Sequence, residues 1–340
     1  MNSVSTQVHL RSRPTGWPTE RNFSLETVSL QPPRAGEVRV RNEYISVDPY
    51  MRGRMNDVKS YIPPFALNEV MTGGAVGRVV ESSDDALSPG DAVLHFQGWR
   101  DVAQGPAEQF TRLSPESPDI PLSAYLGVLG LTGLTAYVGL LTIAEFTEGD
   151  TVFVSGAAGA VGSIVGQIAK IKGAGLVVGS AGSADKVRRL TDSYGFDAGF
   201  NYHDGPVRDQ LADAAPDGID VYFDNVGGEH LEAAISRLRD GGRAALCGAI
   251  STYNSTERTP GPSNMANLVT RGLMLKGFTV GNYTEHQPEF TREMSGWLAA
   301  GRINWDTTVV EGIENAVEAF LGMMHGKNTG KMLVRTGAAD

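Results

Sequence analysis

Cysteine is nearly absent from this chain: Cys247 is the only one among 340 residues. A disulfide within the chain is therefore excluded, and so is a zinc site built mainly from thiolates. Histidine is also scarce in the first third of the sequence, where only His9 and His95 occur. These histidines are too few to hold a zinc ion with three protein ligands unless carboxylates help. We therefore expect no metal site.

Long apolar runs are missing as well. No uninterrupted run in the sequence is long enough to cross a bilayer, and residues 1–13 lack the apolar core of a secretory signal. These absences predict a cytoplasmic protein that does not enter a membrane.

An excess of basic residues is the third absence. Lys and Arg number 29 against 39 Asp and Glu, which gives a formal net charge of −10. A nucleic-acid-binding surface needs clustered Lys and Arg, so we expect no nucleic-acid partner. The charge balance still leaves room for a local basic pocket that binds one phosphate.

The first part of the chain, residues 1 to about 124, has the pattern of a β-rich domain. Residues 38–41 and 75–80 are short strand-like runs, and pairs such as Pro89-Gly90 separate the runs. No long helical periodicity occurs there. The pattern predicts a small, partly open antiparallel barrel.

A different pattern begins near residue 125. Residues 125–141 are apolar and Gly-rich, which predicts a helix, and short apolar strands then alternate with amphipathic helices. We expect strands at 151–154, 176–178, 219–223, 244–246 and 275–278, and helices that include one beginning near 161 and one over 229–238. Repeated β-α-β units predict a parallel sheet with helices on both faces.

The end of the chain returns to the first domain in this interpretation. A helix is expected over about 313–325, and a strand over 331–335 can pair with the first domain. The predicted domains are therefore 1–124, completed by 306–340, and 125–305.

A glycine-rich turn follows the strand expected at 151–154. Residues 155–162 read Ser-Gly-Ala-Ala-Gly-Ala-Val-Gly and lead into a helix, the context that a dinucleotide fingerprint requires. Gly159 would let the backbone approach a pyrophosphate, and Gly162 would let the helix pack close to the strand. Ala157 stands where the usual first glycine would be, so the motif is a variant. The alternative is a glycine-rich turn that binds no ligand.

The end of the next strand indicates which nicotinamide cofactor fits. An NAD site places Asp or Glu there to bind the ribose hydroxyls. Here the end of the strand reads Val178-Gly179-Ser180-Ala181-Gly182, and the first acid is Asp185, expected in the first turn of the following helix. Small residues and the nearby Lys186 suit a 2′-phosphate, which favours NADPH over NADH. The alternative for Lys186 is a solvated helix residue.

Several motifs together resemble the zinc-free branch of the medium-chain dehydrogenase/reductase superfamily, in its NADPH-dependent double-bond reductase group. The group includes curcumin reductases and prostaglandin reductases, and the similarity covers nearly the whole chain. The motifs are residues 46–52 (SVDPYMR), 131–137 (LTGLTAY), 157–162, 223–228 (FDNVGG), 247–254 (CGAISTYN) and 326–331 (GKNTGK). The resemblance implies a Rossmann-type doubly wound parallel sheet plus a β-rich GroES-like barrel domain, and a homodimer.

The resemblance also implies which residues contact NADPH. They are Gly159, Ala160, Val161 and Gly162 at the pyrophosphate; Lys186 and Tyr202 at the 2′-phosphate; Asn225, Cys247, Gly248, Ala249, Ile250, Ser251, Thr252, Tyr253, Phe278, Thr279 and Val280 at the ribose and nicotinamide; and Asn328 from the C-terminal tail. Cys247 is expected to be a small packing residue beside the cofactor and not a nucleophile.

The chemistry that remains without a metal is hydride delivery to an activated carbon–carbon double bond. Reduction of an α,β-unsaturated ketone or aldehyde needs a donor that stabilises the enolate oxygen as it develops. A tyrosine is neutral at pH 7 and donates, so Tyr253 is the leading candidate and Tyr50 the second. For each tyrosine the alternative is a buried core residue with a satisfied hydroxyl.

Other functions stay open at this point. A quinone reductase shares the cofactor and needs no zinc, whereas the scarcity of zinc ligands disfavours a short-chain alcohol dehydrogenase. A non-catalytic NADPH-binding protein is the alternative from a different class. The favoured reading is an enone or enal reductase, with curcumin-like molecules among its possible substrates.

Overall fold

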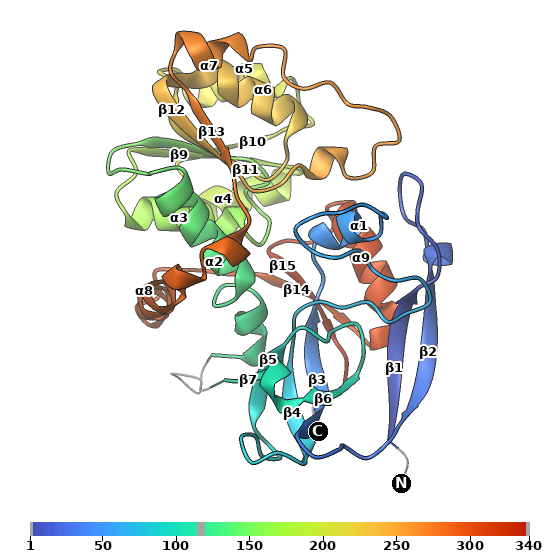
Figure 1. Ribbon diagram of the computed structural model, residues 1–340. Helices are drawn as coiled ribbons and strands as arrows, with labels where there is room; N and C mark the ends of the chain where they lie inside the picture. Colours follow the sequence, from blue (N-terminus) through green and yellow to red (C-terminus); the bar gives the residue numbers. More distant parts are fainter. Residues whose placement is uncertain (1–2, 114–119, 338–340) are drawn as a thin grey trace. The chain divides into compact units, whose positions relative to one another are not determined.

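The computed structural model describes residues 3–113 and 120–337. The chain divides into two compact units: Met1–Gly127 joined by Thr307–Asp340, and Val128–Asp306. The first unit is therefore assembled from both ends of the chain, and the second is one continuous segment. The first unit contains two of the sheets and the second unit contains the third (Figure 1).

The unit formed by residues 128–306 contains a six-stranded parallel sheet. Its strands lie in the order β10-β9-β8-β11-β12-β13, so the chain adds strands outward from β8 in one direction and then returns to add β11 on the other side. The strands are β8 (Thr151–Val154), β9 (Leu176–Ala181), β10 (Ala198–Asn201), β11 (Ile219–Asp224), β12 (Leu238–Leu246) and β13 (Met274–Gly277). This is the doubly wound order, and it confirms the predicted fold class.

Helices cover both faces of this sheet. Helices α5 and α6 pack against each other on one face, and α2, α3 and α4 lie on the other (Figure 1). The bounds are α2 (Leu131–Val138), α3 (Gly162–Ile171), α4 (Ala184–Tyr194), α5 (Val207–Ala214), α6 (Gly228–Arg237), α7 (Ala266–Thr270) and α8 (Gln287–Ala299). Because both faces are covered, every residue of β8 is buried.

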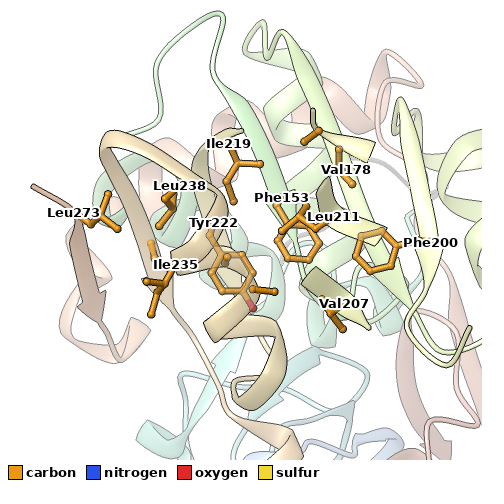
Figure 2. Packing of buried hydrophobic residues seen from close by; sticks show 14 residues of the cluster. Phe153, Val178, Phe200, Val207, Leu211, Ile219, Tyr222, Ile235, Leu238 and Leu273 are labelled. Atoms are coloured by element: carbon orange, nitrogen blue, oxygen red, sulfur yellow. The ribbon is translucent and has the colours of Figure 1, made fainter. Parts of the chain in front are cut away.

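The core on the α5–α6 side is built around aromatic strand residues. Phe153 and Tyr222 stack with ring centroids 5.1 Å apart, and Phe153 also stacks on Phe200. Figure 2 shows Tyr222 between Ile235 of α6 and Phe153, with Phe200 on the far side of Phe153. The aromatic strand residues therefore fix the central strands, whose ends carry the site described below.

The other unit contains a seven-stranded sheet and a separate two-stranded one. The larger sheet runs β14-β15-β3-β4-β5-β7, with β6 paired to β3, and β1 pairs only with β2. The elements are β1 (Ser3–Leu10), β2 (Phe23–Leu30), β3 (Glu37–Ser46), α1 (Tyr50–Arg54), β4 (Ala75–Ser82), β5 (Ala92–His95), β6 (Val102–Pro106), β7 (Phe110–Arg112), β14 (Thr307–Glu311), α9 (Ala316–Met324) and β15 (Lys331–Arg335).

The C-terminal strand completes this sheet, as its sequence predicted. Strand β15 pairs antiparallel with β3, placing Leu333 opposite Ser46, and parallel with β14. A buried ion pair strengthens the join: the Lys331 ammonium donates to the Asp48 carboxylate at 2.5 Å and to the Val47 carbonyl at 2.9 Å. The end of the chain is thus a structural part of the first unit.

Three local predictions were wrong. The helix expected over 125–141 is shorter: α2 begins only after Gly130, and a π-helical turn over Gly139–Ile143 follows it. The sheet expected to be antiparallel contains the parallel pair β14–β15. Strand β12 begins at Leu238 and not at 244. The prediction missed its first residues because they are polar, Asp240 among them, and do not show a strand pattern.

Within the described residues no helix combines the length and apolar character that a membrane span needs.

Candidate active site at the carboxyl edge of the parallel sheet

The site lies where the strand order of the parallel sheet reverses. Strands β8 and β11 are neighbours, but their following connections lead to opposite sides of the sheet. Ligands bind outside the carboxyl ends of parallel strands at such a point. Ser155 follows β8 and Asp224 ends β11, and their side chains are in contact, with Ser155 Oγ 3.2 Å from Asp224 Oδ1.

The glycine-rich turn after β8 leads directly into α3. The turn is held by the Ala157 N–H, which donates to the Ser180 carbonyl at 2.9 Å, and α3 begins at Gly162. A Cβ added at Gly162 would lie 2.5 Å from the Gly156 carbonyl oxygen, so only glycine lets the helix start this close to the turn. The N–H groups of Ser163 and Ile164 donate to the Gly159 and Val161 carbonyls, both at 3.1 Å. The start of α3 still carries the partial positive charge of a helix N-terminus, which suits a diphosphate.

The end of β9 is the second part of the candidate site, and it has no acidic side chain at its tip. Ser180 is fully buried, yet its hydroxyl has no hydrogen-bond partner within the described residues. A Cβ added at Gly182 would lie 2.7 Å from the Tyr202 hydroxyl, so these residues are in close contact. Ser183 caps α4 by accepting from the Lys186 N–H at 3.3 Å, which places Lys186 in the first helical turn.

Lys186 provides a cation in the first turn of α4, and the Tyr202–His230 pair lies after β10 and in α6. Burial lowers the pKa of the Lys186 ammonium, a penalty that a nearby phosphate would offset. The Tyr202 ring packs edge-on against His230 with centroids 5.3 Å apart. His230 Nε2 is buried and has no hydrogen-bond partner within the described residues, and burial lowers the pKa of His230 to about 4. We refer to Ser180, Lys186, Tyr202 and His230 as the β9 cluster.

At the end of β11, Asp224 organises a buried hydrogen-bond network. Its Oδ1 accepts from the Tyr222 hydroxyl at 2.7 Å, from the Ser155 hydroxyl, and from the backbone N–H groups of Val226 and Gly227 at 2.9 and 2.7 Å. Burial raises the pKa of Asp224, and these hydrogen bonds oppose the rise. Because backbone N–H groups can only donate, the network favours the ionised carboxylate.

The same network positions Asn225 and the loop after β12. The Asn225 side chain donates to the Ser155 carbonyl at 2.7 Å, and its N–H donates to the Ser155 hydroxyl at 3.0 Å. The N–H groups of Cys247 and Gly248 both donate to the Asp224 carbonyl, at 2.9 and 3.0 Å. The loops after β8, β11 and β12 therefore meet at Asp224.

Tyr253 follows a short 3₁₀ turn over Ile250–Thr252 in this loop. Its hydroxyl oxygen accepts from the Ala249 N–H at 3.3 Å, so the oxygen is held while the hydroxyl proton is left to donate. Burial, and to a lesser extent the charge of Asp224, raises the pKa of Tyr253, which keeps the hydroxyl protonated. Burial also raises the pKa of Cys247 to about 12, so its thiol does not ionise near neutral pH and is a poor nucleophile.

Residues 278–280 continue from the edge strand β13. The Phe278 N–H lies 3.4 Å from the Leu246 carbonyl, and the Phe278 ring meets the Phe223 ring edge-on with centroids 6.4 Å apart. Thr279 and Val280 begin the next 3₁₀ turn. All the expected contact residues between 159 and 280 thus belong to one unit, and most follow the carboxyl ends of its strands.

Tyr50 and Asn328 belong to the other unit. Tyr50 is the first residue of α1, two positions after the ion-paired Asp48. Its buried hydroxyl makes no hydrogen bond of normal geometry within the described residues, and burial together with the Asp48 charge raises its pKa. The Asn328 side chain donates to the Gly330 carbonyl at 2.8 Å, in the turn before β15.

Residues 3–113 and 120–337 contain no group of three or more His, Cys, Asp or Glu side chains that could hold a metal ion. His95, in the first unit, is a residue type that can bind zinc, but its Nε2 lies 2.9 Å from the Asn42 side-chain oxygen. The residues present therefore do not fit a catalytic zinc site.

Sequence reasoning missed Asp224, Ser155 and His230. Asp224 ends a buried strand directly before Asn-Val-Gly-Gly, and a polar residue at the carboxyl end of a parallel strand is a signal that points to the site. Nothing in the sequence around His230 distinguishes it from an ordinary helix residue.

Comparison with protein families identifies two matching regions. Residues 6–113 match the family described as the N-terminal domain of oxidoreductase, and residues 160–299 match the family described as zinc-binding dehydrogenase. The matches fall on the first unit and on the unit with the parallel sheet.

Individual proteins match over nearly the full length. The chain is 42% identical to the NADPH-dependent curcumin reductase of Escherichia coli over 338 residues, which covers 97% of this chain and 96% of that protein. It is 40% identical to the NADP⁺-dependent 2-alkenal reductase of Nicotiana tabacum, with 96% of each chain covered. The crystal structure of CurA from Vibrio vulnificus in complex with NADPH superposes with a TM-score of 0.93 at 42% identity, covering 98% of this chain and all of that one.

Proposed function

This chain belongs to the medium-chain dehydrogenase/reductase superfamily, and we propose that it uses NADPH to reduce the carbon–carbon double bond of α,β-unsaturated ketones and aldehydes. One observation carries the proposal. A glycine-rich turn and a hydroxyl donor, Tyr253, meet around a single strand-order reversal, and no metal-ligand group accompanies them in the described residues. Relatives named as curcumin reductase and 2-alkenal reductase match this chain over nearly its full length.

The residues of the site fit an NADPH molecule. The unpartnered Ser180 hydroxyl and His230 nitrogen are polar atoms that a ligand would complete, and Lys186 supplies a cation for the 2′-phosphate. The turn at 159–162 would hold the diphosphate, and Asn225 with residues 247–253 and 278–280 would line the ribose and nicotinamide. When bound, NADPH supplies a hydride, which is the reducing equivalent of the reaction.

Tyr253 is the proposed hydrogen-bond donor to the substrate. The hydride adds to the β-carbon of the enone, the double-bond electrons move to the carbonyl oxygen, and a proton from solvent then adds to the α-carbon. A hydroxyl that donates to the carbonyl oxygen stabilises the enolate more than the ground state, so it accelerates the reaction. The Ala249 N–H holds the Tyr253 oxygen, which leaves the proton for this role.

The first unit is proposed to supply Tyr50 and Asn328. Tyr50 is the second candidate donor, a role that the family resemblance implies. Asn328 is proposed to contact the cofactor. We also propose that the units Met1–Gly127 with Thr307–Asp340, and Val128–Asp306, are the GroES-like catalytic domain and the NADP-binding domain expected from the sequence.

Zinc independence, dimerisation and location complete the proposal. No step is assigned to zinc, because the described residues do not fit a zinc site even though one matching family is described as zinc-binding. A homodimer is inferred from the family and is tested by light scattering during size-exclusion chromatography. The cytoplasmic location stays a prediction from the composition.

A substrate panel tests the function. We expect enones and enals to cause loss of NADPH absorbance with the purified protein, and product analysis to find a saturated ketone or aldehyde with the carbonyl intact. Faster turnover of quinones than of any enone would favour the quinone reductase alternative. NADPH binding without turnover of any member of the panel would favour a non-catalytic protein.

A further inference from the structure

The Asp224 carboxylate lies where a negative charge is costly. The residue is 2% exposed, and no ion pair within the described residues includes it. Its neighbour Ser155 begins the turn that we propose holds a diphosphate, so two kinds of anion would lie near each other. A buried charge without a cationic partner lowers stability unless something else compensates.

The oxidised and reduced forms of the cofactor differ in the charge of the nicotinamide ring, which a nearby carboxylate would sense. Their phosphates are the same, so repulsion from Asp224 disfavours both forms equally. The nicotinamide ring is neutral in NADPH and carries one positive charge in NADP⁺. Resting on the proposed function, we propose that the Asp224 carboxylate selectively stabilises the oxidised ring, which lowers the midpoint potential of the bound pair and makes bound NADPH a stronger hydride donor.

The position of the carboxylate supports this role. Asp224 ends the central strand β11, and its backbone carbonyl accepts from the N–H groups of Cys247 and Gly248, where the loop that carries Tyr253 begins. Its negative charge reaches that loop: added to the larger effect of burial, it raises the pKa of both Cys247 and Tyr253. The charge therefore acts on the part of the candidate site where the reacting end of the cofactor is proposed to lie.

The carboxylate is also held in place before any ligand binds. Oδ1 accepts from two hydroxyls and two backbone N–H groups, and the Tyr222 ring that provides one hydroxyl is fully buried and stacked on Phe153 (Figure 2). A charge that is held in a fixed position requires little reorganisation energy when the charge of a nearby group changes. Asp224 thus has an electrostatic role, which its fixed charge exerts through space.

The direct test is the ratio of two dissociation constants in Asp224→Asn. This substitution keeps the size and an oxygen acceptor but removes the charge. We expect the Kd of NADP⁺ to rise about tenfold more than the Kd of NADPH, measured by calorimetry, which corresponds to a rise of about 30 mV in the midpoint potential of the bound two-electron couple. Equal changes in the two constants would overturn the proposal.

Tyr222→Phe is the matched control. It removes one hydrogen bond to Oδ1 and leaves the charge and the stacked ring in place. The two Kd values should change in parallel in this variant. A change in their ratio as large as that in Asp224→Asn would show that loop geometry sets the preference, and the proposed charge effect would be wrong.

The unmodified protein provides a second measurement if Asp224→Asn does not fold. The proposal then requires NADP⁺ to bind at least as tightly as NADPH, and tighter binding of NADPH would overturn it. The proposed function fails separately: binding of both nucleotides with no turnover of any enone would contradict the function and leave the ratio test intact. A protein that binds neither nucleotide would contradict both.

Discussion

Two parts of the candidate site in the parallel-sheet unit differ in how far their polar groups are satisfied. In the β9 cluster, the Ser180 hydroxyl and His230 Nε2 are buried and have no hydrogen-bond partner within the described residues. At the end of β11, the Asp224 carboxylate already has four donors within the chain. The β9 cluster thus has unsatisfied polar groups, whereas the hydrogen-bond network of Asp224 is preorganised.

The difference separates binding from chemistry. Buried polar groups without partners cost free energy, and a ligand that completes them is favoured over one that does not. The β9 cluster is therefore suited to choosing between nucleotides. A network that is already complete is suited to holding charges and dipoles steady during a reaction. Substitutions in the two parts should consequently change different kinetic parameters.

The largest expected effect is at Lys186. Lys186→Ala should raise the KM for NADPH by about 10- to 100-fold, because a hydrogen bond to a charged group contributes about 1.5–3 kcal/mol. The KM for NADH, which lacks the 2′-phosphate, should change little. Steady-state kinetics with both nucleotides make the comparison.

Arg188→Ala is the control for that substitution. Arg188 lies on the same helix, is 66% exposed and pairs with Asp185, so its loss should leave both KM values nearly unchanged. Equal increases for NADPH and NADH in Lys186→Ala would show that the β9 cluster does not recognise the 2′-phosphate.

His230, in the β9 cluster, should make the stability of the folded protein sensitive to acid. Its pKa is about 4 in the folded protein, below the ordinary value of 6.5, so the unfolded state binds more protons between these values. The free energy of unfolding should therefore fall as the pH falls, with His230 accounting for about 2 kcal/mol between pH 6.5 and 5. Urea unfolding across this range measures the effect.

The variant His230→Gln isolates that contribution. Because glutamine does not titrate, the loss of stability on acidification should be smaller than in the unmodified protein. His95, whose pKa burial lowers to about 3, still contributes in both proteins and cancels in the comparison. Identical pH profiles for the two proteins would mean that His230 is not buried in its neutral form.

A substitution of Tyr253 tests the preorganised part of the site, at the loop that the Asp224 network holds. Tyr253→Phe should lower kcat by about tenfold and change KM less, since the hydroxyl acts mainly on the enolate-like transition state. The loss is smaller than the 10²–10³ typical of an oxyanion donor, because water or another hydroxyl can take its place. A deuterium isotope effect on hydride transfer must accompany the measurement. With that step rate-limiting, an unchanged kcat would exclude the role and make Tyr50 the next residue to test.

Metal removal should have the smallest effect. Exhaustive chelation should leave enone reduction unchanged, because the described residues contain no group of ligands that could hold a metal. Mass spectrometry provides the metal content. Stoichiometric zinc combined with loss of activity on chelation would contradict the prediction.

The backbone part of the site was predictable from the sequence, and the side-chain network was not. Strand Thr151–Val154, the glycine turn and the start of α3 are encoded by neighbouring residues, so their local pattern predicts them. The contacts of Asp224 join residues 155, 222, 226 and 227, and the first of these is 69 positions away. Such contacts depend on which strands become neighbours, and local patterns carry little information about that.

Burial explains the other omission. His230 was not singled out because a histidine in an amphipathic helix is ordinary in sequence. Its significance comes from the Tyr202 ring packed against it and from the absence of a partner for Nε2 within the described residues, which are properties of the packed structure. The same limit applies to β12, whose polar first residues were assigned to the preceding connection.

The pairing of β15 with β3 has a consequence for how the protein is made. Synthesis proceeds from the N-terminal side, so β3 leaves the ribosome long before β15, and the Lys331–Asp48 pair joins positions 283 residues apart. By then all strands of the parallel sheet have already been synthesised. Residues 37–41 of β3 pair with β6, but residues 44–46 stay without their β15 partner for most of translation. This short stretch of open edge can pair with other chains until β15 is made.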